Sequence, residues 1–450
     1  GNIMTAHALH ASGLVCTGWD DGRVRVHHVG NAATSSNAML REKRVCNHPI
    51  HSVCLGSIEV HGQDKETSSV GLMESATGSA NKSGASQSPK FAIIGCGGGD
   101  IYIFWIYNAR LEMLQSFAHV DAVGSLGLHV ISQQTMLLVS SSHDVVKCWE
   151  LIHQEHAQPS SSSSSLRNLV STKESKLLVP DSTVIEMSLI HEIDAEGSVD
   201  HVAIYGHTGK ELHPKTSYNL QIGVLSQDGD IRLYHGHSNG GQIHIDMEPF
   251  SLIRNTTAIS KDADDHPPEI SAANSIRLND TDFSELDTNL REPARQLSTK
   301  GPARLLWNRG QVIFSPSSNE LLVRFADGMC KAFSLPSGDF IHEVSGHRSS
   351  TLVLVHVDQR GQDVFTSEQH VSLEYAVIIC DEYGRIMQWL PDQGKSALVL
   401  DFAKHFVGKN SALSEPFMIR DLVWCSLTHQ IIVLANDSNV YIVESAQTES

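Results

Sequence analysis

The chain of 450 residues combines enough apolar material for a large core with a strongly acidic balance of charge. Hydrophobic residues make up 40% of it, which excludes a wholly disordered protein. Lys and Arg number 33 against 51 Asp and Glu, a formal net charge of −18. Such a chain has no general attraction for the phosphates of nucleic acid or of anionic lipid, so neither is expected as its partner.

The eight cysteines occur singly, without a Cys-x-x-Cys pair, and most lie in apolar stretches where cysteine acts as a small buried hydrophobe. A secreted disulfide framework is usually short and rich in cysteine, so an intracellular location is expected, in the cytoplasm rather than the nucleus. The most apolar window, 91–107, is interrupted by a glycine run and by Asp100, so no membrane span is predicted. Because the chain starts with Gly1-Asn2, we expect a piece of a longer protein.

Short β-branched runs, each followed by a Gly, Asp or Asn turn and a second alternating run, recur along the chain. This pattern predicts pairs of half-buried strands and no sustained helix. Seven copies occur, and they begin at Leu14, Ala92, Leu137, Ile222, Leu321, Ala376 and Ile431.

Three polar stretches interrupt these repeats, at residues 61–89, 153–176 and 255–301. The second contains six consecutive serines. Each has too little apolar surface to offset the entropy lost on ordering its backbone, so disordered surface loops are predicted. A phosphorylation site, or an acidic docking motif around Phe283 and Leu286, is the functional alternative.

Two segments resemble a known repeat. AHVDAV, at 118–123, leads through SSSHDVVKCWE to Trp149-Glu150, and SGDFIHEVSGH, at 337–347, leads to Trp389. The chain therefore resembles the WD40-repeat family, whose repeat opens near Gly-His, turns at Asp-Gly and ends near Trp-Asp. Over most of the chain, the resemblance implies an all-β fold, a seven-bladed WD40-like β-propeller with long disordered insertions.

The resemblance treats residues 1–450 as a single propeller. A blade needs neighbours on both faces, so the ring must close between its first and last repeats. The closing strand is either the tail 446–450 or missing from this sequence, and we favour the second. The expected blades span 3–50, 51–118, 119–180, 181–250, 302–346, 347–402 and 415–450.

In this family a His, a Ser or Thr, an Asp and the Trp form a hydrogen-bonded set within a blade. No repeat here carries all four: the third has His143 at the Asp position. The resemblance therefore implies structural roles, without marking a partner-binding residue, for His119, Ser141, Trp149, His347, Trp389, Asp21, Asp228 and Asp327.

Signatures of catalytic and metal chemistry are missing from the sequence. The 26 histidines include no His-Glu-x-x-His, and no paired cysteines accompany them, so no metal site is predicted. The stretch GCGGGD, at 95–100, lacks the third glycine of a phosphate cradle and precedes a strand, so it is interpreted as a tight turn. No catalytic residue and no cofactor is predicted.

By resemblance, the expected function is a non-catalytic protein–protein interaction scaffold that assembles a multiprotein complex through peptide or domain docking on its faces. The acidic charge favours a basic partner. Two alternatives stay open. One is a non-catalytic propeller subunit of an RNA-modifying or RNA-processing enzyme complex, marked by a basic stripe such as Arg23, Arg25 and Arg232 would form. The other is a propeller enzyme with convergent carboxylates in a polar funnel.

Overall fold

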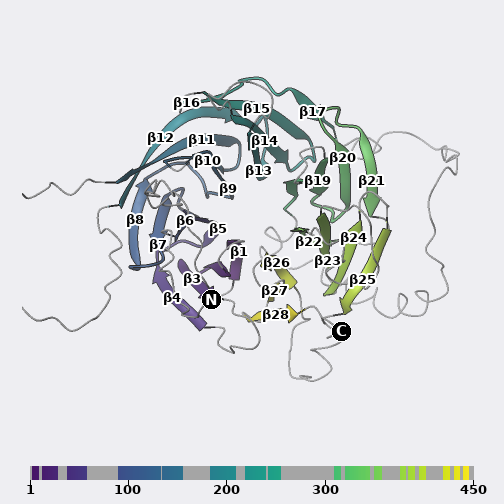
Figure 1. Cartoon of the computed structure of the whole chain (residues 1–450), viewed down its shortest axis with the longest axis horizontal. Helices are drawn as coiled ribbons and strands as arrows, with labels where there is room; N and C mark the ends of the chain where they lie inside the picture. Colours follow the sequence, from purple (N-terminus) through teal and green to yellow (C-terminus); the bar gives the residue numbers. More distant parts are fainter. Residues whose placement is uncertain are drawn as a thin grey trace, which may run out of the picture.

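The computed structural model describes most of the chain in seventeen stretches. They are residues 3–9, 13–28, 38–57, 90–132, 134–155, 183–208, 218–239, 242–254, 309–315, 320–344, 349–356, 375–381, 384–390, 395–401, 419–425, 430–435 and 439–444. All regular elements in these stretches are β-strands, and they form seven antiparallel sheets around a centre (Figure 1). This arrangement confirms the predicted seven-bladed propeller.

Each sheet is built from strands that follow one another in the chain, so each is one blade. Blade one contains β1 (Ile3–Leu9), β2 (Leu14–Trp19), β3 (Arg23–His28) and β4 (Ala38–Arg44). Blade two contains β5 (Ile50–Ser57), β6 (Lys90–Cys96), β7 (Ile101–Trp105) and β8 (Arg110–Gln115). Blade three contains β9 (Ser125–Val130), β10 (Thr135–Ser141), β11 (Val145–Glu155) and β12 (Thr183–Asp194). Blade four contains β13 (Val199–Thr208), β14 (Tyr218–Ser226), β15 (Ile231–Asn239), β16 (Gln242–Ile245) and β17 (Ser251–Ile253).

The remaining three blades follow the same plan. Blade five contains β18 (Gln311–Phe314), β19 (Glu320–Arg324), β20 (Cys330–Ser334) and β21 (Phe340–Val344). Blade six contains β22 (Ser349–His356), β23 (Tyr375–Asp381), β24 (Arg385–Leu390) and β25 (Lys395–Asp401). Blade seven contains β26 (Ile419–Cys425), β27 (Gln430–Ala435) and β28 (Val440–Glu444).

The first strand of every blade lies nearest the centre of the ring (Figure 1). These inner strands touch in succession, β1 with β5, β5 with β9, and onward through β13, β18, β22 and β26. Strand β26 also contacts β1, which closes the circle. Since β1 pairs with β2 in its own sheet, the ring closes by side-chain packing, without a strand exchanged between the described ends.

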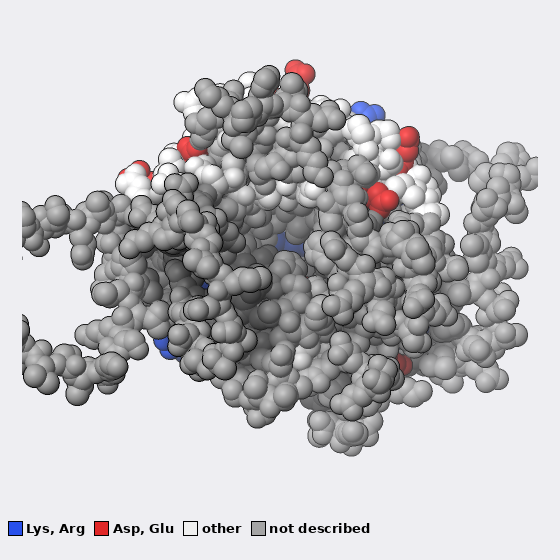
Figure 2. All heavy atoms as spheres, viewed as in Figure 1, with Lys and Arg blue, Asp and Glu red and all other residues white. Residues whose placement is uncertain are grey.

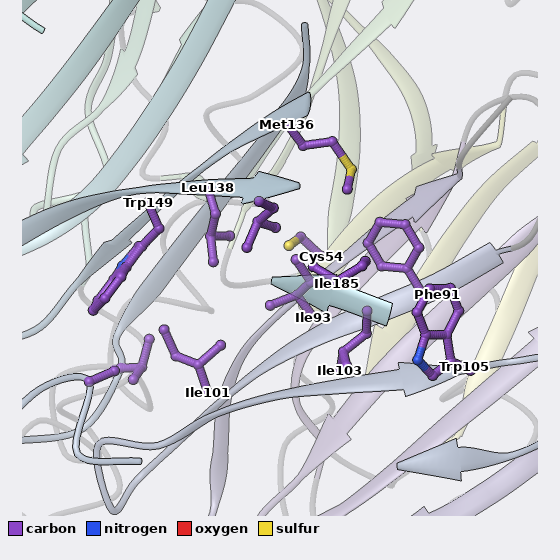
Figure 3. Packing of buried hydrophobic residues seen from close by; sticks show 13 residues of the cluster. Cys54, Phe91, Ile93, Ile101, Ile103, Trp105, Met136, Leu138, Trp149 and Ile185 are labelled. Atoms are coloured by element: carbon purple, nitrogen blue, oxygen red, sulfur yellow. The ribbon is translucent and has the colours of Figure 1, made fainter. Parts of the chain in front are cut away.

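Apolar side chains fill every gap between neighbouring blades. The described residues form seven buried clusters, one at each interface, and Figure 3 shows the one between blades two and three. There Phe91 and Ile103 of blade two face Leu138 and Trp149 of blade three. The second strand of a blade is covered on both sides, which explains why β2 and β27 are buried along their whole length.

The boundary between blades three and four differs from the sequence-based assignment. Strand β12 pairs with β11 along its whole length, so it is the outer strand of blade three and not part of blade four. The pairing of β11 with β12 could not be predicted from the sequence, because the serine-rich stretch separates the two strands. Of the three predicted insertions, 61–89 and 255–301 lie outside the described residues, as does the tail 446–450. The third, 153–176, begins inside β11 and is otherwise outside them.

The tight turns between second and third strands depend on glycine at two well-defined positions. Gly22 and Gly99 have φ angles of 77° and 83°, in the left-handed region. A side chain on either would meet the backbone of the next connection, because its Cβ would lie 2.1 Å from Cys46 O or His119 O. The same two glycines accept hydrogen bonds from that connection, through Val45 N at 2.8 Å and His119 N at 3.1 Å.

Replacing Gly99 with Ala should therefore lower the free energy of unfolding by more than about 1 kcal/mol, since it adds left-handed strain to a backbone clash. Gly98→Ala is the matched control, because its Cβ would meet only the exposed ring of His48, at 3.0 Å. Urea unfolding of both variants measures the difference. Equal stabilities would contradict the role assigned to Gly99.

Candidate functional site

One end of the ring carries the turns between second and third strands and the connections that lead from one blade to the next. We call this end the turn face. Its described segments are the turns 20–22, 97–100, 142–144, 227–230 and 326–328, and the connections 45–49, 116–124, 195–198 and 309–310. Hydrogen bonds interlock them: Ala195 N donates to Asp144 O at 2.9 Å, and Gln227 N donates to Ser198 O at 2.8 Å. From blade one to blade five, the described part of the face is thus an interlocked backbone surface.

A polar residue occupies one equivalent position on the inner strand of every blade. In each blade this residue pairs with the second strand next to the turn, and in five blades a register shift immediately precedes it. Such bulges re-aim side chains at the ends of strands. The seven residues are Thr5, Ser52, Ser125, His201, Gln311, Thr351 and Asp421.

Three of these residues join one blade to the next, whereas Asp421 Oδ1 accepts from its own neighbour Leu422 N at 2.9 Å. Ser52 Oγ donates to Val123 O at 2.8 Å, and Ser125 Oγ accepts from Val202 N at 3.2 Å. His201 Nδ1 accepts from Val312 N at 3.4 Å. Hydrogen bonds from this ring of polar residues therefore link blades two, three, four and five around the centre of the propeller.

Two arginines, the buried Arg324 and the half-buried Arg309, lie beside this ring. Arg309 Nη1 donates to Gly124 O at 3.1 Å, and Arg324 Nη2 donates to Arg309 O. Asp200, which is only 4% exposed, accepts from Gly310 N at 2.6 Å. Burial raises the pKa of Asp200, against the opposing effect of that hydrogen bond and of both guanidinium groups. Burial also lowers the pKa of Arg309 and of Arg324. The group has the character of a structural charge cluster that joins blades three, four and five.

Three histidines close to the ring are held neutral. The pKa of His51, His119 and His201 is lowered to about 4 in each case, chiefly by burial. A nearby cation adds to the effect: Arg309 for His51, Lys147 for His119 and Arg324 for His201. Burial and the nearby cations account for the lowered pKa of these three histidines.

The hydrogen-bonded set expected in blade three is present with one change of residue. Ser140 Oγ lies 2.8 Å from His119 Nε2 and accepts from Trp149 Nε1 at 2.8 Å. The serine is thus Ser140 and not Ser141, because consecutive side chains of a strand point to opposite faces. Ser141 Oγ is buried on the other face without a hydrogen-bond partner among the described residues, and His143 is exposed.

The other blades replace this set with apolar contacts. By strand register, the position of Ser140 is Ile94, Val224, Val323, Ile379 and Val433 in blades two, four, five, six and seven. In blade six the described atoms include no acceptor for the buried Trp389 Nε1, and His347 lies outside the described residues. Only blade one keeps a hydroxyl, Thr17, which accepts instead from Trp19 Nε1 at 3.0 Å.

The three turn aspartates have local contacts. Asp21 Oδ1 accepts from Arg23 N at 3.2 Å, and Asp327 Oδ1 accepts from Met329 N at 3.0 Å. Both therefore stabilise their own turn. Asp228 is exposed in the corresponding turn of blade four, beside Gly229. None of the three joins a His–Ser–Trp set through a hydrogen bond given for the described residues.

Two exposed apolar residues on the turn face have no signal in the amino-acid sequence. In the connection 116–124, Ala118 and His119 are buried, whereas Phe117 is 83% exposed and Val120 is 98% exposed. Phe117 N donates to Asp100 Oδ1 at 2.9 Å, and its φ is 49°. The backbone is thus held in a form that displays both apolar side chains to solvent, as an anchor point for a partner would require.

In the described ranges, no group of three or more His, Cys, Asp or Glu side chains is placed to hold a metal ion. No helix found there has the length and apolar character needed to cross a membrane.

With this geometry in place, the chain can be compared with known proteins. No model of a protein family matches it, and no curated protein matches it. Among solved structures it is similar to the WD40 β-propeller domain of Doa1, with 12% sequence identity and a TM-score of 0.48, over 99% of this chain and 94% of that chain. Its own blade topology makes it a seven-bladed β-propeller.

Replacing Ser140 with Ala should lower the free energy of unfolding by about 1–3 kcal/mol, because the buried Trp149 N–H and His119 Nε2 both lose their partner. Ser141→Ala removes a buried hydroxyl that has no partner among the described residues, so it should be neutral or slightly stabilising. Denaturant unfolding of the two neighbouring variants makes the comparison. A larger loss for Ser141→Ala would overturn the assignment.

Stability should also fall as the pH drops from about 6.5 to 4.5. The folded-state pKa of His51, His119 and His201 lies below the unfolded value, so the unfolded chain takes up protons first in this window. Each histidine contributes up to about 1.4 kcal/mol per pH unit to the slope of the free energy of unfolding against pH. His201→Gln should reduce the slope measured by urea unfolding across the window, and an unchanged slope would count against its neutral state.

Proposed function

We propose that this protein is a non-catalytic interaction scaffold that docks a basic peptide segment of a partner protein on the turn face. The fold supports the general part of the proposal, because WD40-like propellers typically serve as protein-interaction platforms. The rigid, interlocked backbone supports docking, since a preorganised surface loses little entropy on binding.

The acidic charge of the turn face is the reason for proposing a basic partner. Its described segments contain a single Lys or Arg, Arg309, which is engaged with Gly124 O. Opposite charges across an interface speed encounter and select the partner. The same segments contain nine acidic residues, two of which, Asp21 and Glu196, are paired with arginines of the adjoining strands. The nine are Asp20, Asp21, Asp100, Asp121, Asp144, Glu196, Asp228, Asp230 and Asp327. Figure 2 shows several acidic groups along the upper edge of the described surface, together with a few basic groups there and elsewhere in the view.

The RNA-associated alternative draws no support from the three arginines considered in the sequence. Arg23 and Arg25 lie 2.7 and 2.8 Å from the carboxylate oxygens of Glu42. Arg232 pairs with Glu196 at 2.9 Å. Each charge is matched locally, so they form no basic stripe for phosphates.

Binding can be tested by fluorescence anisotropy with three labelled probes: a Lys/Arg-rich peptide with one aromatic residue, its Asp/Glu counterpart, and a single-stranded RNA of equal length. The basic peptide should bind, with an affinity that falls as salt rises, and the other two should not. Affinity purification of the native protein at two salt concentrations, with nuclease treatment, should then yield protein partners without RNA. Preference for the RNA would transfer support to the alternative, and failure of all three probes would overturn docking on this face.

The double variant Phe117→Ala/Val120→Ala should weaken binding of the basic peptide by at least about tenfold, as expected for apolar anchors at the centre of an interface. The control is Met113→Ala/Phe340→Ala. It removes two other exposed apolar side chains, which are 54% and 58% exposed and lie on the outer strands β8 and β21. Both variants should fold like the parent. Equal binding by the two would exclude the connection 116–124 as an anchor.

A further inference from the structure

Two cysteine sulfur atoms meet on the turn face between blades one and two. Cys46 lies in the connection from β4 to β5, and Cys96 ends β6. They are 50 positions apart in the chain, yet their Sγ atoms lie 3.0 Å apart. A disulfide bond has a length of about 2.05 Å, so a side-chain movement of roughly 1 Å would join them.

Backbone hydrogen bonds hold both residues in place. Cys96 N donates to Asp100 O at 3.0 Å, and Cys96 O accepts from Gly99 N and Val123 N, both at 3.1 Å. On the other side, Val45 N and Cys46 N donate to Gly22 O at 2.8 and 3.4 Å. The approach of the two sulfurs is therefore set by the turns of two blades and not by flexible side chains alone.

Their surroundings give the two thiols different reactivity. Among the cysteines whose exposure is described, Cys46 is the one that is partly exposed, while Cys96 is buried. The hydrogen-bonded contact with Cys96 lowers the pKa of Cys46 to about 7, with help from the charge of Arg44 and against the effects of partial burial and of Asp100. The same pairing, together with burial, raises the pKa of Cys96. Cys46 is thus the nucleophile of the pair, since the thiolate is the reactive form.

We propose that Cys46 and Cys96 form an oxidation-sensitive dithiol, which a hydroperoxide converts into a disulfide across the seam between blades one and two. This modification site is independent of the proposed docking function, because it needs only the isolated protein and an oxidant.

The reaction balances in two steps. The Cys46 thiolate attacks the terminal oxygen of the hydroperoxide, the O–O bond breaks, and the departing alkoxide takes up a proton to leave as an alcohol. Cys46 is then a sulfenic acid. The Cys96 sulfur, losing its proton, attacks Cys46 Sγ, the S–O bond breaks, and water leaves. Two thiols and one hydroperoxide give one disulfide, one alcohol and one water.

The disulfide would fix the connection 45–49 to the end of β6. Because Gly97 N already donates to Pro49 O at 2.8 Å, the connection lies along the neighbouring turn before oxidation. The added link would remove conformations from the unfolded chain, so the oxidised protein should melt at a higher temperature than the reduced protein.

The test treats the fully reduced protein with hydrogen peroxide, blocks free thiols with N-ethylmaleimide, and maps non-reduced peptides by mass spectrometry. The expected result is a crosslinked peptide pair containing Cys46 and Cys96. Cys148→Ser is the control and should behave like the parent, because burial raises the pKa of that thiol to about 12. Iodoacetamide should label Cys46 first, with a half-maximal rate near pH 7.

Cys96→Ala separates the two chemical steps. This variant should form no crosslink, should label more slowly at Cys46, and should accumulate a sulfenic acid that dimedone captures. If it fails to fold, peptide mapping of the parent protein decides alone. Peroxide treatment that leaves Cys46 unlinked to Cys96, or that oxidises a buried cysteine first, would overturn the proposal.

Discussion

The packing of one blade against the next is the interaction on which the rest of this molecule depends. A four-stranded sheet has two apolar faces, and neither can be left in water without losing most of the favourable free energy of folding. Seven interfaces, each filled by a buried cluster, satisfy both faces of every blade at once. The turns and connections that could bind a partner are positioned by this ring and contribute little to its core.

This dependence explains how the blades tolerate the loss of the hydrogen-bonded set that resembles the WD40 pattern. Blade three keeps Ser140 between His119 and Trp149, whereas blade six has Ile379 at the same register. The apolar replacement is fully buried and packs with Trp389 against blade five. A hydrogen-bond network and a well-packed apolar group can each occupy the position, because buried polar groups need partners and apolar groups need only close contact.

The sequence predicted the architecture well and the individual contacts poorly. Strand alternation and glycine turns are local properties, so seven repeats could be counted from them. The assignment of β12 failed because strand pairing across a long polar stretch leaves no local trace. Ser140 takes the role expected for Ser141, because the side that a residue faces follows from its register with Trp149, and the order of residues in the motif does not show that register. The meeting of Cys46 with Cys96, and the display of Phe117 and Val120, arise from turns of separate blades and had no signal in the sequence.

The contact between β1 and β26, which joins the first and last described blades, has a consequence for assembly. The cluster between blades seven and one includes Val15, Trp19, Val423, Ile432 and Leu434. It also joins strands separated by nearly the whole chain, the kind of contact that forms slowest. The blades can therefore stack in chain order as an open arc, and the last step is the meeting of β1 with β26. Thermal fluctuations should open the ring first at this interface, which is held closed by this small apolar cluster.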